Sequence, residues 1–590
     1  MPIPRNGHPR PQWVRQDWRC LNGRWQFEID SGNSGLERGL LDRQLADEIV
    51  VPFCPESELS GVGNTDFLNA VWYRRDLDVP AEWNGRRVLL HFQAVDYDAT
   101  VWVNGHEVVR HRGGFTPFSA DITAVAPPGQ KARLVLRARD DHRPFKPVGK
   151  QSSEYHNHGC HYTRTTGIWQ TVWLEAVGRT YMDRPRITPD LPGGRFLVEC
   201  PLKGDSPAGL TLRATLSDDS GVVAEAQTPA DCGLSPALVL EIPPDRRRLW
   251  SPAAPFLYDL HFQLIDADGI ALDKADSYAG LRAITIDGSA VRINGEAVFQ
   301  RLVLDQGYYP DGIMTAPSDE ALVRDIELSL EAGFNGARLH QKVFEERFLY
   351  HADRLGYLVW GEFADWRLPK FQDPRATWIT QWIEAVQRDY NHPAIVGWCP
   401  MNETQQPLDD EIHEHDDVMI GAFLATRAAD ATRPVLDVSG YCHRVGDADV
   451  WDCHDYSQNP EVLREHHAGL PDGRPFECGP GERKWSVPFN GQPFFVSEFG
   501  GIWWNPEAAE GEDSWGYGDR PTTEEEFYRR FEALTEVLLE NPGMFGYCYT
   551  QLTDVYQEQN GIYRFDRSGK LNVARIAAAQ QRPAAVERNA

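Results

Sequence analysis

Two glutamates that follow apolar runs are the residues best placed to do chemistry. Glu403 ends the stretch Ala-Ile-Val-Gly-Trp-Cys-Pro-Met-Asn-Glu at 394–403, and Glu498 ends Phe-Phe-Val-Ser-Glu at 494–498. A buried carboxyl pair can divide catalytic work, because mutual repulsion keeps one group protonated while the other is ionised. A single such glutamate is often only an ion-pair or capping residue, but two at comparable positions favour a shared site.

Cleavage of a glycosidic bond is the reaction that needs this pair. One carboxylic acid protonates the departing oxygen and the other carboxylate attacks the anomeric carbon. A separation of about 5 to 5.5 Å leaves no room for an intervening water and gives retention of configuration. We therefore expect Glu403 to be the acid/base and Glu498 the nucleophile.

The region after residue 283 is predicted to supply the scaffold, because apolar β-like runs alternate there with amphipathic helical ones. Helices are expected at 318–331, 345–355, 376–390 and 523–539. Eight strand-and-helix units in about 300 residues indicate a (β/α)₈ barrel, whose active site lies at the carboxyl ends of its strands. Glu403 and Glu498 then follow the fourth and seventh strands. The eight predicted strands are 298–304, 334–339, 357–360, 395–399, 434–438, 450–453, 494–496 and 545–549.

The first half of the chain is predicted to be β-rich. Strands are expected at 88–92, 99–103 and 107–110, the last two joined by the hairpin dipeptide Asn104-Gly105. Further strands at 210–217, 237–242 and 257–265 fit an immunoglobulin-like sandwich. The predicted domains are a jelly-roll β-sandwich (1–178), an immunoglobulin-like β-sandwich (179–283) and a TIM barrel (284–590).

Composition excludes several classes of function. The formal net charge of −28 would repel nucleic acid, and no apolar stretch is long enough to cross a membrane. The ten cysteines are scattered and the N-terminus does not resemble a secretory signal, so we expect reduced thiols and a cytoplasmic protein. The expected partner is a carbohydrate, and the chemistry requires no cofactor.

Motifs along nearly the whole chain resemble glycoside hydrolase family 2, which includes many β-galactosidases and β-glucuronidases. Segments 391–403 and 497–500 (Ser-Glu-Phe-Gly) are similar to the family's acid/base and nucleophile segments. Segments 72–75, 95–98 and 167–170 resemble its jelly-roll domain, and 249–252, 257–258 and 293–295 resemble its sandwich domain and the entry into the barrel. The resemblance makes a homo-oligomer an expectation.

The resemblance also implies a set of substrate-binding residues. It implies that Asn402 holds the sugar's 2-hydroxyl and that Arg338 and His340 orient carboxylates or bind hydroxyls, although the family's Arg-x-Ser-His is shortened here. Asp305 and Gln306 replace a common His-Glu. The full set expected to bind substrate is Asn402, Asp305, Arg338, His340, Tyr456, Trp366, His454 and Trp504.

The identity of the sugar stays open at this point. Family members that cleave uronides carry Asn-x-Lys near the end of the barrel, whereas this chain has Glu558-Gln559-Asn560 there. A second carboxylate is unwelcome next to Glu558, so we expect a neutral, β-galactoside-like sugar. The alternatives are an α-L-arabinofuranosidase, a β-galactofuranosidase, a β-glucuronidase or a catalytically inactive carbohydrate-binding protein.

A histidine-rich loop offers a rival chemistry. His156, His158, Cys160 and His161 carry metal-ligating groups at close spacing. They lie in a segment rich in Tyr, Asn, Thr and Gly, which favours a loop that lines the barrel mouth over a metal site. We therefore predict no metal, and keep a zinc-dependent hydrolase as the competing hypothesis.

Overall fold

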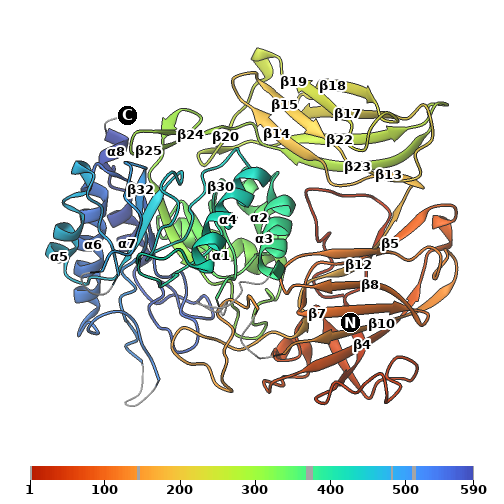
Figure 1. The fold of residues 1–590 in the computed structure, drawn as a ribbon, viewed down its shortest axis with the longest axis horizontal. Coiled ribbons are helices and arrows are strands. Elements are labelled where there is room, and N and C mark those ends of the chain that lie inside the picture. Colours follow the sequence, from red (N-terminus) through yellow and green to blue (C-terminus); the bar gives the residue numbers. More distant parts are fainter. Residues whose placement is uncertain (1–2, 142–145, 367–375, 480–482, 508–512, 589–590) are drawn as a thin grey trace.

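A computed structural model describes residues 3–141, 146–366, 376–479, 483–507 and 513–588. The N-terminal part, the central part and the C-terminal part occupy separate regions in Figure 1, and the segment that follows β10 extends from the N-terminal part toward the C-terminal one. None of the described helices combines the length and the apolar character needed to span a bilayer.

The N-terminal part contains two antiparallel sheets. Buried residues of both sheets, such as Tyr73 and Leu90, belong to one hydrophobic core, so the sheets pack face to face. The predicted hairpin at Asn104-Gly105 is confirmed, because both residues have positive φ (51° and 82°) between two paired strands. The six-stranded sheet runs β3 (Asp47–Val51), β2 (Gly23–Ile29), β4 (Ala70–Asp78), β10 (Lys131–Arg139), β7 (Asp98–Val103) and β8 (His106–Arg112), and the four-stranded sheet runs β1 (Trp18–Cys20), β12 (Val172–Val177), β5 (Arg87–Phe92) and β9 (Phe118–Asp121).

The central part is also antiparallel and has its own core. Its main sheets are β18 (Gly221–Pro229), β17 (Thr211–Asp218), β22 (Tyr258–Ile265) and β23 (Ala271–Ala279), and β14 (Arg186–Asp190), β15 (Arg195–Glu199) and β19 (Ala237–Glu241). The remaining short elements before the barrel are β6 (Val95–Asp96), β11 (Gly167–Ile168), β13 (Thr180–Met182), β16 (Leu202–Gly204), β20 (Trp250–Ser251), β21 (Ala254–Pro255), β24 (Ile284–Asp287), β25 (Ala290–Ile293), β26 (Glu296–Ala297), η1 (Glu58–Ser60), η2 (Ala81–Trp83) and η3 (Pro244–Arg246).

The C-terminal part is built on a parallel sheet of seven strands, which is consistent with the predicted barrel. In spatial order the strands are β30 (Ile395–Cys399), β29 (Leu358–Glu362), β28 (Gly336–Leu339), β27 (Gln300–Asp305), β33 (Met544–Tyr549), β32 (Phe494–Phe499) and β31 (Trp451–Asp455). The helices are α1 (Asp319–Glu331), α2 (Glu346–Leu355), α3 (Ala376–Asp389), α4 (Glu414–Ala429), α5 (Pro460–His467), α6 (Glu524–Glu540), α7 (Val573–Gln580) and α8 (Ala585–Arg588), with η4 at Leu470–Asp472.

The fifth predicted strand, 434–438, is wrong as a continuous strand. The segment makes isolated parallel bridges instead, from Val435 to Trp398 and from Ser439 to Asn402. Pro434 has no N–H to donate, and the carboxylate of Asp437 accepts the N–H of Val438 at 2.9 Å. The Asp437 carboxylate thus accepts an N–H that would otherwise donate to a neighbouring strand. The segment still lies along β30, through the bridge from Val435 to Trp398.

One core joins the N-terminal part to the barrel. Phe115, Tyr162 and Trp169 from the first 180 residues belong to the same buried cluster as the barrel interior. Trp169 also donates from Nε1 to the carbonyl of Gly114 at 2.8 Å, which fixes its position. The N-terminal part is therefore packed against the end of the barrel where the candidate site lies.

Candidate active site

The structure brings Glu403 and Glu498 together, with His454 between them. Glu498 lies in β32, His454 lies in β31, and Glu403 lies four residues beyond β30. One carboxylate oxygen of each glutamate and one ring nitrogen of His454 all lie within 4.8 Å of one another. His454 Nδ1 is 2.8 Å from Glu403 and 3.4 Å from Glu498. Two carboxylates this close are nearer to the spacing of about 5 to 5.5 Å used for retention than to the about 6.5 to 9.5 Å used for inversion.

The backbone at Glu403 adopts an uncommon conformation. Its φ of 54° lies in the left-handed region, which non-glycine residues seldom occupy. The Glu403 N–H donates to the Ser439 carbonyl at 2.8 Å, and Asn402 bridges to the same residue. The irregular fifth segment therefore holds the conformation that turns the Glu403 side chain toward His454.

Arg338 connects the parts of the site. Its side chain is fully buried and donates from Nε to Glu362 at 2.6 Å and from Nη1 to the Ser497 carbonyl at 2.6 Å. From Nη2 it donates to Asn402 at 2.7 Å and to Glu498 at 3.0 Å. One guanidinium from β28 thus fixes side chains that lie in or just after three other strands, and its planar geometry allows all four hydrogen bonds at once.

The charges around Glu498 keep it ionised. Burial alone would raise its pKa, but His454, Arg338 and His340 oppose that effect and lower the pKa to about 2. Burial lowers the pKa of His454, yet Glu498 and Glu403 outweigh it and leave the pKa raised. Tyr456 donates from its hydroxyl to Glu498 at 2.5 Å, and burial together with Glu498 raises the pKa of Tyr456 well above its usual range. The nucleophile position therefore holds a carboxylate beside two protonated donors.

The amide of Asn402 has a partner for its oxygen but none for its nitrogen among the described residues. Its Oδ1 accepts from Arg338, while its Nδ2 is buried with no partner among the residues that the structure describes. A buried amide donor without a partner is costly, so this N–H₂ is suited to a ligand hydroxyl.

A cavity of about 390 Å³ opens beside these groups. Trp366 and Glu403 line it from the barrel, and Cys160 and His161 line it from the N-terminal part. The histidine-rich loop therefore lies at the mouth of the site. Within the described part of the chain, three metal-ligating groups come close together only at Glu403, His454 and Glu498, and not at His156, His158, Cys160 and His161.

Three other residues predicted to bind substrate, His340, Asp305 and Trp504, are buried and are not among the residues that line this cavity. His340 is buried with Nδ1 2.9 Å from Glu362, and burial followed by Lys150 lowers its pKa well below its usual range. Asp305 is buried at the end of β27, accepts the Gly307 N–H at 2.9 Å and has a pKa raised by burial to about 7. Trp504 lies in the hydrophobic core and packs against Phe527.

Sequence reasoning missed Glu362 and Lys150. Glu362 ends β29 after an apolar run, so the rule that identified Glu403 and Glu498 also points to it. Lys150 is a buried residue of the N-terminal part, and interactions with Glu558, Glu498 and Glu403 help to raise its pKa against burial. No signal in the sequence places Lys150 beside the barrel.

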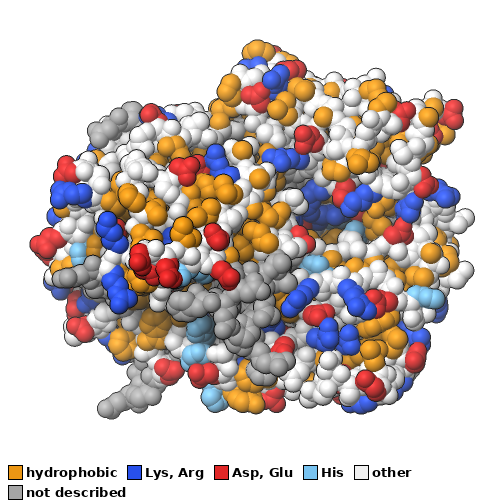
Figure 2. Space-filling model, viewed as in Figure 1, with side chains coloured by type: hydrophobic (Ala, Val, Ile, Leu, Met, Phe, Trp, Pro, Cys, Tyr) orange, Lys and Arg blue, Asp and Glu red, His pale blue; other side chains and the backbone are white. Residues whose placement is uncertain are grey.

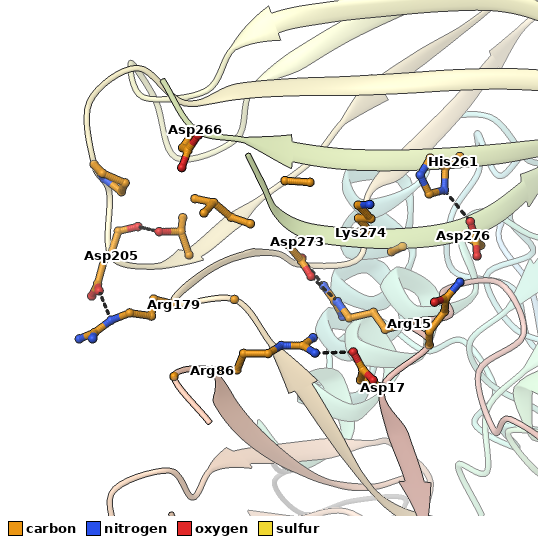
Figure 3. Close-up of a pocket in the computed structure, with 18 of the residues that line it drawn as sticks. Arg15, Asp17, Arg86, Arg179, Asp205, His261, Asp266, Asp273, Lys274 and Asp276 are labelled. Carbon is orange, nitrogen blue, oxygen red and sulfur yellow. Dashed lines mark hydrogen bonds and ion pairs between the residues drawn. The ribbon is translucent and has the colours of Figure 1, made fainter. Parts of the chain in front are cut away.

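A cavity of about 970 Å³, larger than the one beside Glu403, lies elsewhere, between the N-terminal and central parts (Figure 3). Most of its charged groups pair with one another: Arg15 with Asp273 at 2.9 Å, Arg179 with Asp205 at 3.3 Å, His261 with Asp276 at 2.7 Å, and Arg86 with Asp17. Such paired charges join two parts of a chain and leave little for a ligand to satisfy. On the face in Figure 2, Lys and Arg side chains are interspersed with Asp and Glu.

Comparisons with known proteins agree on one family. The family model "Glycosyl hydrolases family 2, sugar binding domain" matches residues 18–174, and the model "Glycosyl hydrolases family 2" matches residues 180–282. A β-glucuronidase of Paenibacillus borealis is 29% identical over 68% of this chain and 70% of its own length. A β-galactosidase of Thermoanaerobacter pseudethanolicus is 27% identical over 58% of this chain and 46% of its own length.

A solved structure shares the fold along almost the whole chain. The β-glucuronidase from Ruminococcus gnavus in complex with D-glucuronic acid superposes with a TM-score of 0.76, covering 96% of this chain and 98% of that one. The sequence identity is 19%, so this similarity shows the multidomain architecture alone.

Proposed function

Because the chain belongs to glycoside hydrolase family 2 and is a glycoside hydrolase, we propose that it cleaves terminal non-reducing glycosides with retention, using Glu498 as nucleophile and Glu403 as acid/base. The observation that carries this proposal is the approach of the Glu403 and Glu498 carboxylates to within 4.8 Å beside His454. A structural ion-pair role accounts for the low pKa of Glu498 but does not explain the open amide of Asn402.

The reaction follows from the positions of the two carboxyl groups. Glu403 donates its proton to the glycosidic oxygen while Glu498 attacks the anomeric carbon, so the leaving group departs and a glycosyl-enzyme ester forms. Glu403, now ionised, takes a proton from water, and the water oxygen attacks the anomeric carbon and releases Glu498. Two inversions at one carbon give net retention.

The neighbouring donors favour the transition state. Arg338 and Tyr456 hold the two oxygens of Glu498, so the nucleophile needs no reorganisation before attack. The free N–H₂ of Asn402 is suited to the sugar's 2-hydroxyl, a contact that strengthens as positive charge develops at the anomeric carbon. His454, His340, Asp305, Trp366 and Trp504 complete the proposed substrate-binding set.

We infer a neutral sugar as the substrate, β-galactoside-like. Glu558 is buried, with 1% of its surface exposed, and accepts hydrogen bonds from Tyr162 and from Asn560. The region that carries Asn-x-Lys in uronide-cleaving relatives thus presents a fixed carboxylate, which repels an acidic sugar. A β-glucuronide is the second candidate, because the β-glucuronidases among the relatives and the buried cation Lys150 both favour it.

The proposed domains are a jelly-roll sandwich at 1–178, an immunoglobulin-like sandwich at 179–283 and a TIM barrel at 284–590. The separate cores of the first two parts and the parallel sheet of the third support this division.

A panel of aryl glycosides tests the proposal. It comprises β-galactoside, β-glucoside, β-mannoside, β-glucuronide, α-L-arabinofuranoside and β-galactofuranoside, with the anomer of the released sugar followed by NMR. We expect turnover of a neutral member with retention. Sugar binding without turnover of any member would support an inactive carbohydrate-binding protein instead, and an inverted first product would contradict the double displacement.

A further inference from the structure

A loop of the N-terminal part enters the proposed active site. The Tyr162 N–H donates to the Lys150 carbonyl at 2.8 Å, which closes the loop at its base. The Gly149 N–H donates to the Ala364 carbonyl at 3.2 Å, which attaches that base to the segment after β29. Lys150 is therefore held against the barrel by backbone contacts on both sides.

A second contact ties the tip of this loop to the end of the barrel. Gln557 donates from Nε2 to the Gly159 carbonyl at 2.7 Å, and Trp515 donates from Nε1 to the same carbonyl at 2.7 Å. Glu558, the next residue after Gln557, pairs with Val555 through both backbone groups. The loop that supplies Cys160 and His161 to the pocket is thus joined to the segment around Glu558 by hydrogen bonds.

The Lys150 side chain is buried, and its ammonium lacks a close polar partner among the described residues. Only 5% of its surface is exposed, and its Nζ lies 5.3 Å from the centre of the Trp366 ring and 5.9 Å from that of the Tyr162 ring. Throughout the described ranges, no hydrogen bond or ion pair within 4 Å satisfies this group. An ammonium carries three N–H donors, and a side chain with so little exposed surface gives them little access to water. A ligand oxygen is the group that this position is suited to receive.

Tyr162 links Lys150 to Glu558. Its ring lies beside the Lys150 ammonium, and its hydroxyl donates to one oxygen of Glu558. Asn560 donates to the other oxygen of Glu558 at 3.2 Å. Burial lowers the pKa of Lys150, but Glu558 first, and Cys160, Glu498 and Glu403 after it, outweigh burial and leave the pKa raised. Tyr162 therefore contacts both charged groups, with its ring toward Lys150 and its hydroxyl on Glu558.

We propose that Lys150 and Glu558 form a clamp that binds adjacent hydroxyls of the terminal sugar and selects a neutral sugar over a uronate. This inference rests on the proposed glycosidase function. The ammonium donates to a hydroxyl oxygen and the carboxylate accepts a hydroxyl proton, so a neutral diol satisfies both groups without a change in charge. A sugar carboxylate would pair with Lys150 but be repelled by Glu558. Glu558 is therefore the residue that excludes uronates.

Three variants test the clamp: Glu558→Gln, Lys150→Met and the two together. The assay is kcat/KM on aryl galactoside and glucoside against galacturonide and glucuronide, which differ only at C6. Glu558→Gln should raise the ratio of uronide to neutral hydrolysis about tenfold or more, because a charged hydrogen bond to Lys150 becomes available. Lys150→Met should lower kcat/KM on the neutral sugar about tenfold to 100-fold, mainly through KM. In the double variant the gain on uronides should vanish.

Several results would overturn the clamp. One is an unchanged ratio of uronide to neutral hydrolysis in Glu558→Gln. Another is a gain in uronide hydrolysis that persists in the double variant, since such a gain would not depend on Lys150. If Glu558→Gln does not fold, Lys150→Arg replaces it: this variant keeps the charge and should retain activity that Lys150→Met loses, and equal losses would contradict the proposal. Lys131→Met, on a side chain 88% exposed, is the surface control and should change no ratio.

The clamp and the proposed function can fail separately. Absence of turnover by the unaltered protein contradicts the glycosidase proposal, whereas the clamp is judged on ratios between variants. If turnover is absent, calorimetric titration with galactose and galacturonic acid reports the same preference, and it should shift toward the acid in Glu558→Gln only while Lys150 is present.

Discussion

Replacement of His454 should move the acid limb of the pH profile upward. His454 Nδ1 lies 3.4 Å from Glu498, and it is the foremost of the charges that lower the pKa of that carboxyl to about 2 against burial. The folded-state pKa lies below the ordinary 4.5, so the ionised form prevails in the native protein and is lost only as the pH falls toward 2. The acid limb of the kcat/KM profile reports the pKa of the nucleophile in the free enzyme. For the unaltered protein this limb should therefore lie near pH 2.

In His454→Gln one positive charge is lost while a donor for Glu403 is kept. Removal of an opposite charge at this distance raises the pKa of a carboxyl by about 1 to 3, which places Glu498 between about 3 and 5. At about pH 4, a nucleophile at the upper end of this range is ionised roughly one time in ten, so kcat/KM should fall by up to about tenfold there relative to neutral pH.

The measurement is kcat/KM on an activated aryl glycoside from about pH 3 to pH 8, with circular dichroism at each pH to confirm folding. His261→Gln is the matched control, because that histidine also pairs with a carboxylate, Asp276 at 2.7 Å, but lies in the central part of the chain. An acid limb in His454→Gln that coincides with that of the unaltered protein would refute the electrostatic role of His454.

The other predictions concern the nucleophile, its support and the absence of a metal requirement. Glu498→Gln should lose nearly all turnover and regain part of it with azide, which replaces the missing nucleophile; failure of rescue in a folded variant would contradict the assignment. Arg338→Met should lower the free energy of unfolding by about 3 to 5 kcal/mol in urea titrations, because Glu362 and Glu498 would be left buried without their cation; a loss below about 1 kcal/mol would argue against this role. EDTA should leave activity intact, since Arg338 already compensates the carboxylate beside Glu403 and His454; loss of activity restored by zinc would support a metal enzyme.

The central chemistry could be predicted from the sequence because it obeys a local rule. In a parallel sheet, the residue that follows an apolar run lies at the carboxyl edge, so Glu403 and Glu498 could be paired without coordinates. The same rule applies to Glu362, whose carboxylate underlies Arg338 instead of facing the cavity. A rule based on position along a strand does not distinguish a group that faces a ligand from one that supports it.

The fifth strand shows where pattern fails. An apolar run with β-branched residues at 434–438 satisfies the strand template, but the template does not include the Asp437 carboxylate, which takes the Val438 N–H. That irregularity has a use at the site, since Ser439 accepts the N–H of Glu403 and donates to, or accepts from, His454 at 2.9 Å. Local departure from regular pairing is thus what orients the acid/base candidate.

The substrate pocket could not be predicted from the barrel alone, because one wall comes from residues more than 200 positions earlier in the chain. Cys160 and His161 line the cavity, and the Lys150 ammonium lies 5.3 Å from the ring centre of Trp366, which also lines it. Contacts of this kind depend on how Phe115 and Trp169 of the N-terminal part pack into the core of the barrel. In this chain the barrel supplies the reacting groups and another part supplies one wall of the pocket. Its sugar preference can therefore change without disturbing the carboxyl pair. We expect substitutions in the 149–162 loop to change specificity and to leave the mechanism unchanged.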